Sequence, residues 1–199
     1  IGSTPDVTLL AKEADGTAEQ AAAASHVYDY NTGEDASALQ SVPEGSYIAN
    51  AYTVEANNDT EMNAQKLTNV AFALDYMNKG GDSASSIEKA DYEISIYKGR
   101  ASANGLTLLS GTPQATVSGT YTSGKCAQDH YFDVPLEEKK QVLLGTGEKF
   151  AVKVTLTNAY LLKDGDDASQ PTSAVFYESV SNTSAESYAN GTALSGRAA

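Results

Sequence analysis

Apolar and polar residues alternate along much of this chain, and the clearest alternation covers residues 148–157. A period of two predicts a β-strand with one buried and one solvated face. Gly145-Thr146-Gly147 precede this segment and supply a turn. The apolar positions, which we expect to be buried, are Phe150, Val152, Val154 and Leu156.

Similar alternations, or short apolar runs between turn residues, recur along the chain. Residues 66–76 follow the pattern with a slip near Asn69 that predicts a bulge, and the Gly- and Ser-rich residues 78–90 predict an inserted loop. The further strands that we predict are 26–30, 46–55, 66–76, 91–98, 106–109, 115–122, 130–134, 141–144 and 173–178. So many short strands, with hardly a core helix, predict an all-β fold, a sandwich or a barrel, with a possible short N-terminal helix.

The two ends differ from the middle. Residues 1–25 are a polar leader or a short helix, because good helix formers at 17–24 follow a cap at Asp15 or Thr17. Residues 26–180 form the β-sandwich domain. Residues 181–199 are rich in Ser, Asn, Ala and Gly and predict a flexible C-terminal segment.

The charge limits the classes of partner. There are 26 acidic and 13 basic residues, a formal net charge of −13, which repels phosphate backbones and anionic lipid. We therefore expect no nucleic-acid partner. No run approaches the roughly 18 to 20 apolar residues of a membrane span. Because the chain opens on Ile1 rather than Met, we expect a processed or trimmed chain from which any signal peptide or anchor has been left out, so the absence of such a segment is no argument for the cytoplasm.

No catalytic set is evident, and we expect the protein not to be an enzyme. Cys126 is the single cysteine, so no internal disulfide forms. His130 follows four residues later, about 13 Å away along an extended chain, and no orienting residue is identifiable; we favour a structural role for both. His26 has no motif around it. A hydrolase that uses two carboxylates stays open as a third hypothesis, although nothing selects two of the 26 acids.

Asp164, Asp166 and Asp167 surround Gly165 and offer hard oxygen ligands to calcium, the one ion that the sequence indicates. The full calcium-loop pattern with its closing glutamate is missing, so a solvated acidic turn is the favoured alternative. Otherwise we expect no cofactor.

Tyrosine is abundant, with 12 Tyr against 4 Phe and no Trp. Exposed aromatic rings stack on sugars, and the tyrosine hydroxyl adds a hydrogen bond. The candidates near turns or chain ends are Tyr121, Tyr131, Tyr177 and Tyr188. The alternative is that these rings cover the edge of the core.

Three segments carry a family resemblance in the middle of the chain. Residues 49–54 resemble an "ANxFT" strand, residues 66–72 with 92–97 resemble an "LxxVxF…YEIxIY" pair, and residues 147–154 resemble "GEKFxVxV". Together, over residues 46–158, they resemble the lectin-like domain that follows papain-like cysteine peptidase domains in surface proteins of anaerobic bacteria. No segment resembles the glutamine, cysteine and tryptophan motif of the peptidase itself.

The resemblance implies a jelly-roll-like antiparallel β-sandwich on a secreted or cell-surface protein, with a role in binding carbohydrate or in targeting a substrate. We therefore expect a secreted or surface, non-catalytic binding module that recognises carbohydrate or a cell-surface ligand. A glycan or a cell-surface protein is then the expected partner, with other modules of a larger protein as neighbours. The alternative is a structural or adhesive spacer domain of a larger surface protein.

Overall fold

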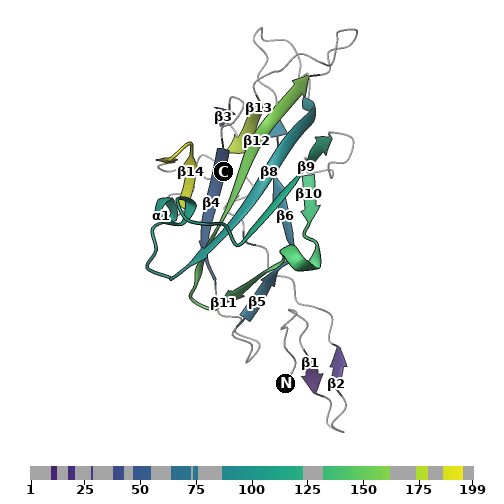
Figure 1. Ribbon diagram of the computed structural model, residues 1–199, viewed down its shortest axis with the longest axis vertical. Coiled ribbons are helices and arrows are strands. Elements are labelled where there is room, and N and C mark those ends of the chain that lie inside the picture. The colour runs from purple at the N-terminus through teal and green to yellow at the C-terminus, as the bar shows by residue number, and fades with distance from the viewer. Residues whose placement is uncertain are drawn as a thin grey trace.

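The protein is represented by a computed structural model (Figure 1), and the structure describes residues 10–12, 18–20, 28, 38–42, 47–54, 64–72, 74–75, 87–122, 132–161, 174–178 and 186–194. These residues form antiparallel strands with one short α-helix and one 3-10 turn. The prediction of an all-β fold is confirmed. No helix in these ranges is long and apolar enough to cross a membrane.

The largest sheet contains six strands, each antiparallel to its neighbours. Its central strand is β12, the segment with the clearest alternation. In spatial order the strands are β15 (Thr192–Ala193), β14 (Glu186–Ala189), β4 (Tyr47–Thr53), β12 (Lys149–Leu161), β8 (Ile87–Gly99) and β9 (Ala115–Thr122).

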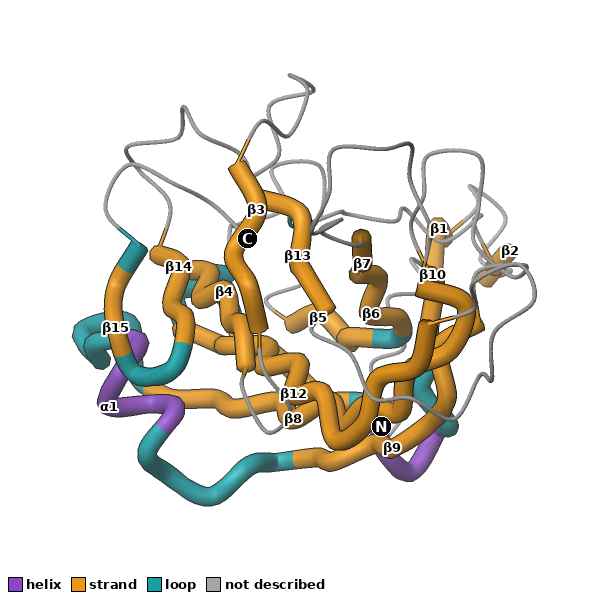
Figure 2. The backbone as a smooth tube through the Cα atoms, turned by 90° about the horizontal axis from the view of Figure 1, so that it is seen from above, coloured by secondary structure: helices purple, strands orange, loops and turns teal. Residues whose placement is uncertain are grey.

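Smaller sheets accompany this large one. They are β6 (Asn69–Phe72) with β10 (Phe132–Pro135), β5 (Ala64–Leu67) with β11 (Val142–Gly145), β3 (Ala38–Val42) and β7 (Leu74–Asp75) on either side of β13 (Ala174–Glu178), and β1 (Leu10–Lys12) with β2 (Ala18–Gln20). Figure 2 shows β12, β8 and β9 along the lower side, with β5, β6, β10 and β13 above them. The arrangement is sandwich-like.

The main core lies between these layers. From the large sheet, Phe150, Ile94 and Leu156 are almost completely buried, and they pack against Val70, Phe72, Phe132, Val134, Val142 and Leu144 from β6, β10 and β11. The rings of Phe72, Tyr92, Tyr121 and Phe132 form a cluster with centroids 5.1 to 6.1 Å apart. Val154 is also buried, while Val152 is partly buried against the same core. The predicted inward face of residues 148–157 is therefore the core face.

The sequence predicts a strand at 106–109, but the structure has a helix, α1 (Gly105–Leu109). Asn104 caps its N-terminus, because the Asn104 Oδ1 accepts a hydrogen bond from the Leu106 N–H at 2.8 Å. Leu108 is buried, whereas Leu106 and Leu109 pack against the same cluster while partly buried. A four-residue apolar run fits either a strand or one helical turn, and here the cap decides.

The slip near Asn69 marks a change of partner. Leu67 pairs with Val142 of β11, whereas Asn69 pairs with Pro135 of β10. Thr68 lies between the two strands, and its carbonyl accepts a hydrogen bond from Leu136 N–H at 2.7 Å. The predicted single strand is therefore divided among three strands in three small sheets, because β7 follows β6 and pairs with β13.

The chain ends also differ from the sequence prediction. Residues 18–20, which the sequence assigns to a polar leader or a short helix, form β2. Within the segment predicted to be flexible, β14 pairs with β4 and turns back through Asn190 and Gly191 into β15. Both turn residues have positive φ, 49° and 80°, as a two-residue hairpin of matching twist requires. Of the strand predicted at 26–30, only Tyr28 lies within the described residues.

Candidate functional site

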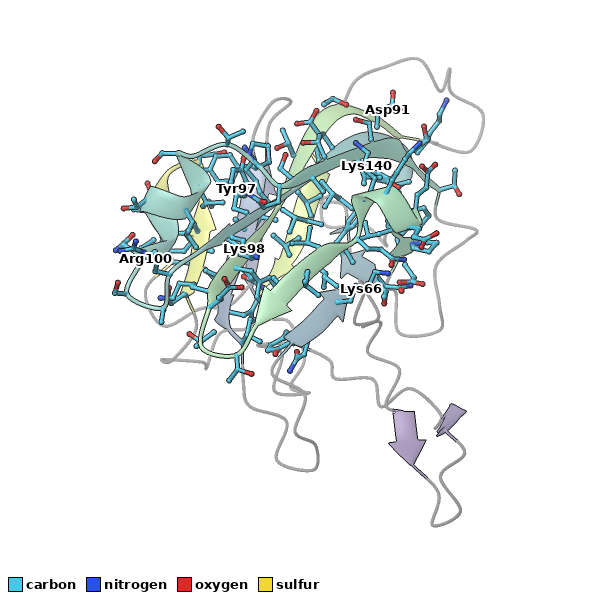
Figure 3. All side chains as sticks on the ribbon, turned by 60° about the horizontal axis from the view of Figure 1, so that its bottom comes forward. Lys66, Asp91, Tyr97, Lys98, Arg100 and Lys140 are labelled. Atoms are coloured by element: carbon cyan, nitrogen blue, oxygen red, sulfur yellow. The ribbon has the colours of Figure 1, made fainter. Side chains whose placement is uncertain are left out.

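The large sheet has a second face, opposite the main core, and α1 covers part of it. Small side chains on the central strands make room for the helix: Ala49, Ala51 and Ala151 are 0 to 2% exposed. They form a second buried cluster with Tyr97, Leu108 and Tyr188. Figure 3 shows Tyr97 on the α1 side of the sheet and Asp91 at the far end of β8.

Beyond α1 this face is polar. The register places Tyr47, Thr155, Glu93 and Ser118 in one row across β4, β12, β8 and β9. The adjoining rows contain Lys153 with Ser95 and Thr116, and Asp91 with Thr120. We call the surface formed by the following residues the polar face: Tyr47, Asp91, Glu93, Thr116, Ser118, Thr120, Lys153 and Thr155. Each of them is partly or fully exposed.

Lys153 lies between two tyrosines. Its Nζ is 5.2 Å from the centroid of the Tyr47 ring and 5.4 Å from that of the buried Tyr97 ring, within the range of cation–π attraction. The partly exposed Tyr47 ring is thereby held in place at the margin of the polar face.

The two carboxylates of the polar face differ in their contacts. Thr120 donates its hydroxyl hydrogen to Asp91 Oδ1 at 2.8 Å, which orients the Asp91 carboxylate. Among the described residues, no side chain forms an ion pair with Glu93. Asp91 and Glu93 point to the same side of β8, about 7 Å apart along the strand. The polar face therefore offers carboxylate acceptors, hydroxyl groups and an aromatic ring.

The structure places the sequence candidates elsewhere. Tyr121 is 3% exposed in the aromatic cluster of the main core, and Tyr188 is 6% exposed against α1. Burial, followed by the neighbouring Glu186 carboxylate, raises the pKa of the Tyr188 phenol. Both rings contribute packing, on opposite faces of the large sheet.

The remaining candidates cannot be compared with the geometry. Tyr177 belongs to β13, and its side chain lies outside the described residues, as do Tyr131, Asp164, Asp166 and Asp167. The same holds for Cys126, His130 and His26. Among the described side chains, no group of three or more His, Cys, Asp or Glu residues could hold a metal ion.

The polar face is not among the sites predicted from the sequence, although the alternation that turns its residues away from the core is visible there. Glu93 alternates with core residues of β8, and Ser118 alternates with those of β9. The strand register, which places residues of β4, β12 and β9 in one row with Glu93, cannot be read from the sequence. No protein-family model and no curated protein matches this chain.

Proposed function

We propose that this protein is a secreted or cell-surface binding module that recognises carbohydrate or another cell-surface ligand through the polar face, without catalysis. The observation that carries this proposal is the row of Tyr47, Thr155, Glu93 and Ser118 across the partly exposed face of the large sheet opposite the main core. The resemblance of residues 46–158 to lectin-like domains, with their jelly-roll connectivity, supports the same class of function.

The chemistry of the row suits a sugar. A carboxylate accepts hydrogen bonds from neighbouring sugar hydroxyls, and bonds to a charged group are the stronger ones. Serine and threonine hydroxyls donate and accept, and a tyrosine ring offers an apolar surface to the sugar ring. A net charge of −13 favours neutral or cationic ligands over polyanions.

Calcium belongs to this proposal only through Asp164, Asp166 and Asp167. Those residues are not among the residues of the polar face, so an effect of calcium and the effect of Glu93→Gln can be measured separately. Measuring binding in calcium and in chelator distinguishes the two.

The test is a glycan array probed with the full chain, with and without calcium, followed by calorimetry on any hit. We expect Glu93→Gln to weaken binding about 10- to 100-fold, because hydrogen bonds to charged groups contribute about 1.5–3 kcal/mol. Ser118→Ala should weaken it less.

Glu137→Gln is the matched control, because Glu137 is a highly exposed carboxylate beside the 3-10 turn Glu138–Lys140, outside the polar face. It should bind like the unaltered protein. An array without hits in either condition, or equal losses for Glu93→Gln and Glu137→Gln, would contradict the proposal. Turnover of a bound glycan would support the hydrolase hypothesis instead.

A structural or adhesive spacer domain is the second candidate. One observation favours it: the two candidate tyrosines with described side chains, Tyr121 and Tyr188, are buried. The test is to replace this domain in its parent protein by an unrelated module of similar length. Retained adhesion would support a spacer, and lost adhesion would support binding.

A further inference from the structure

Two Asn-Gly steps occur in the described residues, Asn104-Gly105 and Asn190-Gly191. At such a step the glycine amide nitrogen can attack the asparagine Cγ, because glycine carries no Cβ to obstruct the approach. A new N–Cγ bond forms, the Cγ–Nδ2 bond breaks, and ammonia leaves. Water then opens the cyclic imide to aspartate or to isoaspartate. The reaction needs only water and base.

Asn190-Gly191 is open to this chemistry. Both residues are exposed at the β14–β15 turn. Around Gly191, a built Cβ would meet only the Tyr47 hydroxyl within 4 Å, at 3.9 Å. Solvent base therefore reaches the amide nitrogen that must lose its proton.

A hydrogen bond also activates the Asn190 amide. The Tyr47 N–H donates to Asn190 Oδ1 at 2.8 Å. Negative charge develops on this oxygen when Cγ is attacked, and a backbone donor already directed at that oxygen stabilises the charge. The contact that joins the turn to β4 thus also favours the reaction.

Asn104-Gly105 has the same sequence in a different setting. Its Asn104 Oδ1 also accepts a hydrogen bond from a backbone N–H, that of Leu106, at 2.8 Å, so the two amides are polarised alike and the steps differ at the glycine. Gly105 is buried, and a Cβ built on it would collide with the Tyr188 ring. The nucleophilic nitrogen is therefore covered, and this step serves as an internal control.

We propose that Asn190-Gly191 is a deamidation site and that isoaspartate at residue 190 releases the β14–β15 hairpin from β4. Isoaspartate adds one carbon to the main chain within a two-residue turn. The turn then loses the geometry in which Asn190 N–H donates to Tyr47 O at 3.2 Å and Asn190 Oδ1 accepts from Tyr47 N–H. This inference does not depend on the proposed function.

The first experiment compares the two steps within one protein. The folded full chain is aged in mildly alkaline buffer, a second sample is aged in urea, and peptide mapping quantifies aspartate and isoaspartate at residues 104 and 190. In the folded sample we expect product at 190 severalfold faster than at 104. In urea the two rates should converge. Equal rates in the folded sample, or product at neither site there while both react in urea, would overturn the proposal.

The second experiment tests the structural consequence by hydrogen exchange. The isoaspartate fraction should lose amide protection in residues 186–194 and in the β4 residues that pair with them. Asn190→Asp keeps the chain length and an acceptor oxygen, so it should retain protection. Asn190→Gly keeps a turn-compatible residue without an amide side chain and should yield no product at 190. Native protection in the isoaspartate fraction would refute the release of the hairpin.

Discussion

At the scale of single residues, a glycine in the large sheet leaves space for an aromatic ring of the neighbouring strand to lie over it. Gly119 of β9 pairs with Tyr92 of β8, and a Cβ built on Gly119 would collide with the Tyr92 ring and hydroxyl. The phenol therefore lies over the glycine. An aromatic side chain that covers a cross-strand glycine compensates for the surface that the glycine leaves open.

Gly119→Ala should lower the free energy of unfolding by about 1–3 kcal/mol, the usual cost of forcing extra atoms into a packed site. Urea titration measures this. Tyr92→Phe removes the atom closest to the new methyl group, so the double variant should cost less than the sum of the two single variants. Additive costs would show that the Tyr92 hydroxyl does not obstruct the new methyl group.

The same tyrosine predicts a pH dependence. Burial raises the pKa of the Tyr92 phenol above 10.0, so above pH 10 the folded state retains a proton that the unfolded state has lost. Its contribution to stability is complete below pH 10 and is lost as the pH rises through the folded pKa. Urea titrations from about pH 9 to about pH 11 should show this fall. Tyr92→Phe should reduce it, and among the described residues Tyr188, whose pKa is raised as well, should contribute to the fall that remains. An unchanged slope in Tyr92→Phe would contradict this assignment.

At the scale of elements, polar side chains join β14 to the rest of the sheet. Lys149 Nζ and Glu186 Oε1 are 2.7 Å apart, with 10% and 39% of the side chains exposed. Ser187 also donates its hydroxyl to Asn50 Oδ1 at 2.6 Å. The short strand is therefore held by side chains as well as by its backbone.

Glu186→Gln should lower the free energy of unfolding by about 1–3 kcal/mol, because the buried Lys149 ammonium loses its counter-charge. Thermal or urea unfolding measures the cost. Glu137→Gln is the control, since Glu137 and Lys139 form an ion pair with side chains 71% and 75% exposed, and such pairs contribute about 0–1 kcal/mol. The double variant Lys149→Met with Glu186→Gln should lower the free energy of unfolding by less than the sum of the two single changes. A loss equal to that sum would show that the pair is not coupled.

The docking of α1 depends on small residues beneath it. Ala51 is fully buried in the cluster that α1 joins, so Ala51→Leu should displace the helix and cost about 1–3 kcal/mol. Hydrogen exchange should then be faster in residues 104–110. Ala193→Leu, at an exposed position of β15, is the matched control and should leave α1 protected. Faster exchange of residues 104–110 in both variants, or in neither, would contradict this account.

At the scale of the whole molecule, charge is the dominant property. The formal net charge of −13 keeps copies of the chain apart, and this repulsion disappears near the isoelectric point of about 4.4. Light scattering should show association that is greatest near that pH and reversible on return to neutral pH. Raising the salt concentration at neutral pH should increase association only weakly. Association that does not vary with pH would show that contacts other than charge control solubility.

The predictability of the fold varies between segments for a physical reason. Segments with a strict period of two, such as residues 148–157 and 115–122, were predicted correctly because one face must be buried. Residues 106–109 and 66–76 were predicted with the wrong element type or boundaries. A short apolar run does not distinguish a strand from a helical turn. The change of pairing partner at Thr68, from β11 to β10, leaves only a weak trace in the sequence.

The candidate site illustrates the same limit. The alternation around Glu93 and around Ser118 shows that both face away from the core, yet nothing in the sequence places them in one row with Tyr47 and Thr155. Likewise, the position of Tyr188 near a chain end suggested exposure, but Glu186 and Ser187 anchor β14 and α1 packs against its buried face.

The sequence alone determined the all-β class, the inward residues of the long strands and the acidic character, because these depend on local periodicity and composition. Only the tertiary structure decided which strands are neighbours, which tyrosines are buried and where the polar face lies. Strand register joins residues distant in sequence through backbone hydrogen bonds that every residue type can form, proline as an acceptor only. The apolar side chains of residues 148–157 therefore specify the buried face of β12. The polar face, on the other side of the sheet, forms only when β4 and β8 pair with β12.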